Sequence, residues 1–286
     1  MNKSKQDSIY FFWSASIVLC MLLALFALLF TSCAKPDGEP KEPANTDIIT
    51  PAEQDEPTDT DAQSPEDTDS TPAPGIVETE PPAVATVLGE TEDMGQEYID
   101  KMVFLGDSTT NGLAHYDVVP QERVWTPKSG TLTLNRWSIS TIVYEDGSEI
   151  SITDAVAKKQ PEYLCITLGV NGVSFMGEED FKRDYTAMVE AIQAASPDTK
   201  IILNSIYPVC ADYKFIKDIS NEKIDAANTW IESIAEATGC RYLNSSSILK
   251  DETGAMHEGY DNNDGIHPNG DTYKKIVSYI RTHGYV

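Results

Sequence analysis

Short apolar runs alternate with amphipathic segments through the last two-thirds of the chain. Runs at 102–105, 163–168, 201–206 and 241–243 have the length and composition of buried strands. Between and after them, apolar residues recur at helical spacing over 181–192, 224–234 and 273–280. This alternation of strand and helix predicts an α/β fold with a parallel sheet that helices cover on both faces.

The segment 124–152 has a different pattern. It is rich in Thr, Tyr and Ile and contains the turn-forming pair Asp146-Gly147. Such a segment predicts one strand followed by a β-hairpin. The sequence therefore indicates a parallel sheet of about five strands with a small β-hairpin insertion.

The first 33 residues are predicted to be an export segment. Lys3 and Lys5 precede an apolar stretch over 9–30, and the order basic, apolar, small is that of a secretory signal. The closing Phe-Thr-Ser-Cys, which ends at Cys33, resembles a bacterial lipobox, although Phe30 stands where Leu is usual. This resemblance implies lipidation of Cys33. The alternative is an uncleaved transmembrane anchor, since the stretch is long enough to span a bilayer.

Residues 34–95 are predicted to form a disordered acidic linker rich in Pro and Thr. More than half of the net charge of −25 lies in this part of the chain, which has almost no large apolar cluster to bury. Residues 96–286 remain for one folded domain. No basic patch is present, so nucleic acid is not expected as a partner. An export segment and a linker together predict a domain held at the extracellular face of the membrane.

Three cysteines belong to the folded domain. Cys165 lies inside an apolar run and is expected to be a small buried residue. A disulfide between Cys210 and Cys240 remains open, and no spacing typical of a metal site links the three.

Three groups of polar residues follow predicted strands or precede the last predicted helix. Ser108 follows the first strand, Asn171 follows the second, and Asp264 and His267 lie in the loop before the last helix. In an open parallel sheet, ligands bind beyond the carboxyl ends of the strands. We therefore expect these residues to meet in one site.

Their chemistry is that of a serine nucleophile. A hydroxyl attacks, an imidazole accepts its proton, and a carboxylate orients the imidazole. His115, His257 and His283 are alternatives for the base, but only His267 has an aspartate three residues earlier. Each element alone has an ordinary structural explanation, such as a serine that caps a helix or an Asn-Gly turn.

Together these motifs resemble those of the SGNH, or GDSL-type, hydrolase family, over about residues 100–286. The first is Gly106-Asp107-Ser108, the second Gly169-Val170-Asn171-Gly172, and the third Asp264-Gly265-Ile266-His267. The resemblance implies a three-layer α/β/α sandwich with a flavodoxin-like sheet. It also implies that Ser108, Asp264 and His267 are catalytic.

In that family the oxyanion hole combines three donors. The resemblance assigns two of them to the Ser108 N–H and the Asn171 side chain. A glycine from a weakly defined motif supplies the third, and Gly130 is chosen by position, with Gly147 as the alternative. Gly172 departs from the family pattern, which has an aspartate there.

The sequence thus predicts an extracellular, membrane-tethered serine esterase that removes acyl groups, most simply acetyl groups, from cell-wall or other polysaccharides. Trp137, Tyr213 and Tyr260 are candidates for stacking on sugar rings. Lipase or acyltransferase activity is an alternative, and so is a non-catalytic glycan-binding or scaffold protein on the same fold.

No cofactor and no metal are expected. The stretch 261–265 hints at a calcium loop, but its glycine comes one position early and no glutamate closes it.

Overall fold

A computed structural model describes residues 85–286. The predicted export segment, Cys33 and most of the predicted linker lie outside these residues. Within 85–286, none of the helices combines the length and apolar character that crossing a membrane requires.

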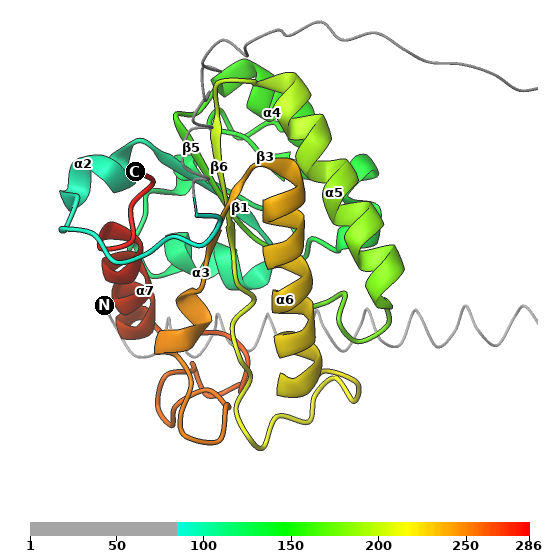
Figure 1. Ribbon diagram of the computed structural model, residues 1–286, viewed down its shortest axis with the longest axis vertical. Helices are drawn as coiled ribbons and strands as arrows, with labels where there is room; N and C mark the ends of the chain where they lie inside the picture. Colours follow the sequence, from blue (N-terminus) through cyan, green and yellow to red (C-terminus); the bar gives the residue numbers. More distant parts are fainter. Residues whose placement is uncertain (1–84) are drawn as a thin grey trace, which may run out of the picture. The chain divides into compact units, whose positions relative to one another are not determined.

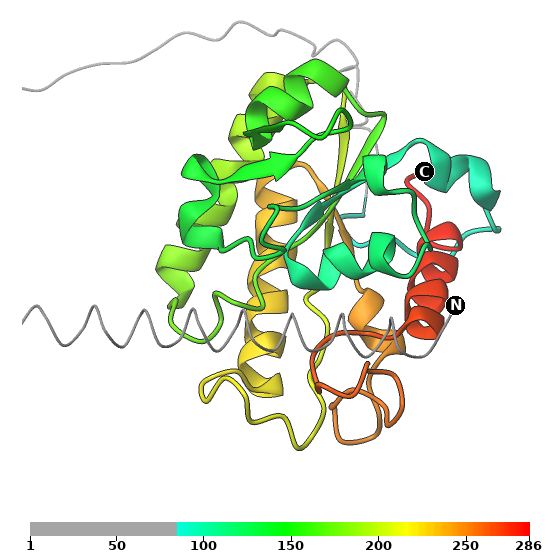
Figure 2. The same cartoon turned by 180° about the vertical axis from the view of Figure 1, so that it is seen from behind.

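A five-stranded parallel sheet forms the centre of the fold (Figures 1 and 2). Its strands are β1 (Met102–Gly106), β2 (Val124–Trp125), β5 (Tyr163–Thr167), β6 (Lys200–Asn204) and β7 (Arg241–Leu243). They lie in the order β2-β1-β5-β6-β7, with every neighbouring pair parallel. The order is flavodoxin-like, and the chain reverses direction across the sheet between β1 and β5. The predicted parallel sheet is confirmed.

Side chains of the central strands alternate between two apolar cores. Val103 and Leu105 of β1 belong to one core, while Met102 and Phe104 belong to the other. The first core includes residues from α4 (Ile152–Lys159), α5 (Glu178–Ala195) and α6 (Asn221–Thr238). The second includes residues from α2 (Gly95–Asp100), α3 (Ser108–His115) and α7 (Gly270–Arg281). Three helices therefore cover each face, which makes the three-layer α/β/α sandwich (Figure 1).

Most of the apolar positions from which the sequence predicted helices are buried in the structure. All five predicted core positions of α5 and all four of α7 are buried, because each forms one stripe along its helix. On α6 the four other predicted positions are buried, but Trp230 is only half-buried. The predicted hairpin also forms, from β3 (Thr141–Val143) and β4 (Glu149–Ser151) joined through the Asp146-Gly147 turn.

The folded part begins earlier than the sequence suggested. Although residue 95 was the expected end of the linker, Leu88 donates from its N–H to Tyr242 O, and Tyr242 donates to Thr86 O. Val87 forms a parallel bridge with Tyr242, and Leu88 is buried. The apolar run 83–88 is short enough to be overlooked beside the acidic linker, yet it adds backbone pairing at the β7 edge.

The three cysteines are free thiols. Cys165 is buried on β5, as predicted. Cys210 and Cys240 do not pair, so the disulfide that the sequence left open is not formed in this structure.

Gly106 provides a test of how closely β1 and β5 pack at the end of the sheet. A Cβ atom at Gly106 would lie 2.0 Å from Thr167 O and 2.2 Å from Thr110 Oγ1. Because one of these atoms is backbone, we expect Gly106→Ala to lower the free energy of unfolding by about 1–3 kcal/mol. Urea unfolding measures this. The control is Gly89→Ala, where nothing lies within 4 Å; equal stability of the two variants would contradict the packing described.

Candidate active site

Ser108 lies where β1 ends and α3 begins. As the first residue of α3, its N–H has no acceptor within the helix and lies at the positive end of the helix dipole. Asp107 is the N-cap: its Oδ1 accepts hydrogen bonds from Thr109 N at 3.0 Å and from Thr109 Oγ1 at 2.8 Å. The cap holds the backbone at Ser108, whose side chain is partly exposed.

Asp107 also joins two loops of the sheet edge. Its side chain is buried, and its Oδ2 accepts a hydrogen bond of 3.4 Å from Gly169 N, in the loop that follows β5. Nearby, Thr110 Oγ1 donates to Thr167 O at 3.1 Å. The loops after β1 and β5 are therefore linked directly at the point where the strand order reverses.

Asp264 and His267 are presented by a tight loop before α7. Asp264 Oδ1 accepts hydrogen bonds from Ile266 N at 3.0 Å and from His267 N at 2.9 Å. Behind them, Asp261 Oδ2 accepts from Gly265 N at 2.8 Å. Gly265 has a φ of +81°, a backbone conformation that favours glycine at this position.

The structure brings the three predicted catalytic residues into one hydrogen-bonded chain. His267 Nε2 lies 2.8 Å from Ser108 Oγ, although the two residues are 159 positions apart. His267 Nδ1 lies 2.7 Å from Asp264 Oδ2. The carboxylate thus holds one ring nitrogen while the other faces the hydroxyl, which is the geometry needed to remove the serine proton.

The other three histidines lie in different surroundings. His115 ends α3 beside Tyr116, His257 packs on Tyr260, and His283 stacks on Tyr279. Of the four candidates for the base, only His267 contacts Ser108 in this structure.

The packing of α3 against α7 holds the two halves of this site together. Tyr273 is buried on α7, and its hydroxyl donates a 2.6 Å hydrogen bond to Thr109 O on α3. Gly112 leaves room for this ring, since a Cβ there would lie 2.1 Å from the Tyr273 hydroxyl. The contact fixes the start of α3, which carries Ser108, relative to the helix that follows His267.

The two aspartates of the site differ in acidity. Burial acts to raise the pKa of Asp264, but hydrogen bonds from the His267 ring and from backbone N–H groups outweigh it and lower that pKa to about 2. Burial raises the pKa of Asp107, against the hydrogen bonds from Thr109 and Gly169. Asp264 therefore stays ionised and able to stabilise an imidazolium over the ordinary pH range.

Asn171 lies in the loop after β5, partly exposed, with its Nδ2 3.4 Å from Leu132 O. Gly169 begins this loop with a φ of +136°, and a Cβ there would lie 2.8 Å from Ile206 and 2.9 Å from Phe181. The loop continues through Gly172, whose N–H donates to Gly169 O at 2.8 Å. This backbone hydrogen bond closes the turn at the position where the family pattern has an aspartate.

Neither candidate glycine for the third oxyanion donor has an uncommitted N–H. Gly130 N donates to Pro127 O at 2.7 Å, and Gly147 N donates to Tyr144 O at 2.8 Å. Both bonds close turns, and both glycines have a positive φ. In this conformation the Gly130 N–H is therefore directed into its own turn, and a donor role for it would require this turn to rearrange.

The three aromatic residues expected to stack on sugars are all partly buried. Trp137 and Tyr213 pack against the first core and Tyr260 against the second. Tyr213 lies against the loop that carries Asp264 and His267, because its ring would lie 3.0 Å from a Cβ at Gly265. Among residues 85–286, no group of three His, Cys, Asp or Glu side chains is arranged to hold a metal ion.

The sequence motifs do not reveal the roles of two residues that shape the site. Asp107 belongs to the Gly-Asp-Ser motif, and an aspartate directly before a helix is also a recognisable N-cap. Tyr273 was assigned to the core by its helical spacing, which gives no sign that its hydroxyl reaches α3.

A family model for the GDSL-like lipase/acylhydrolase family matches residues 104–275, which contain every residue of this hydrogen-bonded chain. The protein belongs to this family. No curated protein matches the sequence.

Several solved structures are similar in fold. A GDSL-like lipase from Bacteroides thetaiotaomicron has 22% identity and a TM-score of 0.46, with 62% of this chain and 83% of that chain covered. A carbohydrate esterase of family 3 from Talaromyces cellulolyticus has 18% identity and a TM-score of 0.42, with 63% and 93% covered.

The acidity of Asp264 predicts how stability depends on pH. Its pKa in the folded protein, about 2, lies below the ordinary value of 3.8. Ionised Asp264 therefore contributes stability that is fully present above about pH 5 and is lost as the pH falls towards 2. We expect the difference in unfolding free energy between the wild type and Asp264→Asn to shrink over that window. Urea unfolding at several pH values measures it, and a difference that grows on acidification would contradict the assignment.

Proposed function

We propose that this protein is a serine ester hydrolase. The observation that carries the proposal is the chain from Ser108 Oγ through the His267 ring to Asp264, with hydrogen bonds of 2.8 and 2.7 Å. Ser108 attacks the acyl carbonyl while His267 accepts the hydroxyl proton, and His267 then gives this proton to the departing alcohol. Water, activated by the same imidazole, releases the acyl group from Ser108.

The negative charge on the carbonyl oxygen requires hydrogen-bond donors. The Ser108 N–H, at the start of α3, is one of them, since no acceptor within the helix competes for it. The Asn171 amide is the second, because its present hydrogen bond to Leu132 O is long, at 3.4 Å, and costs little to give up.

The substrate is proposed to be a short acyl ester, in particular an acetyl ester, on a cell-wall or other polysaccharide. This proposal depends on location. The apolar stretch 9–30, Cys33 and the acidic segment after it would hold the domain outside the cell, either by a lipid or by a membrane anchor. Polysaccharides carrying ester groups are available there to a tethered enzyme.

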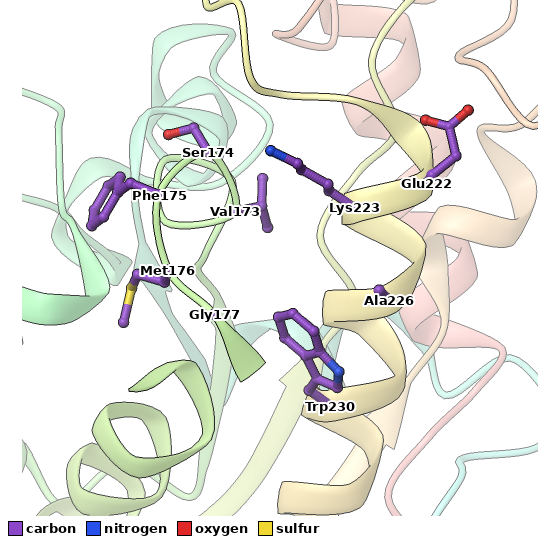
Figure 3. A pocket seen from close by; sticks show the side chains of 9 residues that line it. All are labelled: Val173, Ser174, Phe175, Met176, Gly177, Glu222, Lys223, Ala226 and Trp230. Atoms are coloured by element: carbon purple, nitrogen blue, oxygen red, sulfur yellow. The ribbon is translucent and has the colours of Figure 1, made fainter. Parts of the chain in front are cut away.

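A specific feature favours longer acyl chains as a second candidate. An apolar pocket of about 460 Å³ lies between the segment 173–177, directly after the Asn171 loop, and the first turns of α6. Figure 3 shows Trp230 and Lys223 extending from α6 towards this segment. Ser174 Oγ donates to Asn171 O at 3.0 Å, so the pocket wall and the proposed oxyanion donor belong to one loop.

The first test removes the nucleophile. We expect Ser108→Ala to lower the rate of aryl acetate hydrolysis by at least about a thousandfold, because neither water nor another hydroxyl replaces the activated serine. The substitution shortens a partly exposed side chain, so the unfolding midpoint should change little. A rate that survives in a folded variant would contradict the mechanism, and an inactive wild type would favour a binding or scaffold protein.

The second test separates the acyl groups. We expect kcat/KM for aryl esters to fall from acetyl to octanoyl, because a short acyl group needs only the space beside the oxyanion donors. Trp230→Ala should leave acetyl hydrolysis unchanged. A preference for octanoyl esters that Trp230→Ala removes would instead support the longer-chain candidate. Product analysis with an added alcohol separates acyl transfer from hydrolysis.

A further inference from the structure

A large cavity adjoins the Asp264 carboxylate, and Ser108 is not among its lining residues. Its volume is about 1100 Å³, and Asp264 and Gly265 of the catalytic loop form part of its wall. The segment 210–215, which follows β6, also lines the cavity. Cys210 N donates to Gly265 O at 2.8 Å, so this segment is joined directly to the loop that carries Asp264.

The position of the cavity determines which part of a substrate reaches it. Ser108 and His267 do not line it, and the imidazole ring with its two hydrogen bonds lies between Ser108 Oγ and Asp264. The ester carbonyl has to lie at Ser108, so a substituent of the ester must extend past the imidazole to reach the cavity. An oligosaccharide as the alcohol portion has the length to do so.

The charges around the cavity are almost all negative. Five carboxylates line it, and Lys214 is the one basic residue among its lining residues. Asp251, Asp261 and Asp264 accept hydrogen bonds from their own loops, which accounts for their presence. Asp212 and Glu258 are exposed and make no hydrogen bond or ion pair among residues 85–286, so the fold does not explain them.

An exposed aromatic ring completes the wall. Phe215 has 81% of its surface exposed, and its ring lies 6.0 Å from that of Tyr213. Tyr213 is held by its N–H, which donates to Cys210 O at 3.0 Å. Aromatic faces beside carboxylates suit a ligand that is apolar on one face and positively charged nearby, as an amino sugar is.

We propose that this cavity, the acidic subsite, binds the alcohol portion of an esterified oligosaccharide that carries free amino groups. The inference rests on the proposed function, because it assigns the part of the ester substrate that lies beyond the cleaved bond. Asp212 and Glu258 attract the ammonium groups, and Phe215 packs against a sugar face. The same carboxylates repel uronic acids and other anionic sugars.

The test compares three O-acetylated tetrasaccharides by acetate release: glucosamine with free amines, N-acetylglucosamine, and a uronic acid. We expect kcat/KM to decrease in that order at low salt, by up to about fivefold for each carboxylate that acts. The differences should shrink as salt is added, because ions screen exposed charges. Equal kcat/KM for all three would overturn the proposal.

Variants identify the groups responsible. The double substitution Asp212→Asn with Glu258→Gln should bring the three rates together while leaving aryl acetate turnover unchanged. The control pair, Glu190→Gln with Asp198→Asn, removes two exposed carboxylates, one within α5 and one just beyond its end, and should keep the preference. A preference that persists in the first double variant would overturn the assignment.

The outcome separates the two proposals. Hydrolysis of aryl acetate that depends on Ser108, without any preference among the tetrasaccharides, would leave the ester hydrolase standing and refute the acidic subsite. Loss of aryl acetate hydrolysis from the wild type would refute the proposed function itself.

Discussion

The packing of α3 against α7 is the constraint on which this site depends. Ser108 begins α3, and His267 precedes α7, so their separation follows from how the two helices meet. The buried hydroxyl of Tyr273 donates to Thr109 O, and Gly112 provides the space for its ring. If this buried hydrogen bond were broken, one of its two groups would be left unsatisfied, which costs free energy. The contact between α3 and α7 therefore has a single favoured geometry. The short Ser108–His267 distance is a consequence of that geometry.

The sheet contributes the second part of the arrangement. Parallel strands bring all their carboxyl ends to one edge, and the reversal between β1 and β5 leaves room there for a ligand. Asp107 lies at this reversal. Its buried carboxylate caps α3 and also accepts a hydrogen bond from Gly169 N. The same side chain therefore positions the proposed nucleophile and the loop that carries Asn171. It is held by hydrogen bonds from Thr109 and Gly169, and it is not a member of the hydrogen-bonded chain from Ser108 to Asp264.

Much of the fold and of the candidate site could be predicted from the sequence, for identifiable reasons. Buried strands and amphipathic helices leave periodic apolar patterns, so a parallel sheet with helices on both faces could be predicted from them. Ser108, Asp264 and His267 were found because their motifs are local. Relations between distant segments were not found: the hydroxyl of Tyr273 gives no local signal. The N–H of Gly130 donates within its own turn, and a glycine in a polar loop of the sequence does not reveal this turn geometry. The pairing of 86–88 with β7 was hidden by the acidic composition before it.

The most direct test of the account is the reaction of the protein with a fluorophosphonate, followed by peptide mapping. A serine activated by a neighbouring imidazole reacts, whereas ordinary serines do not. We expect one adduct, on Ser108, and its loss in His267→Ala although Ser108 is still present. An adduct on another serine, or undiminished labelling of Ser108 without the imidazole, would contradict it.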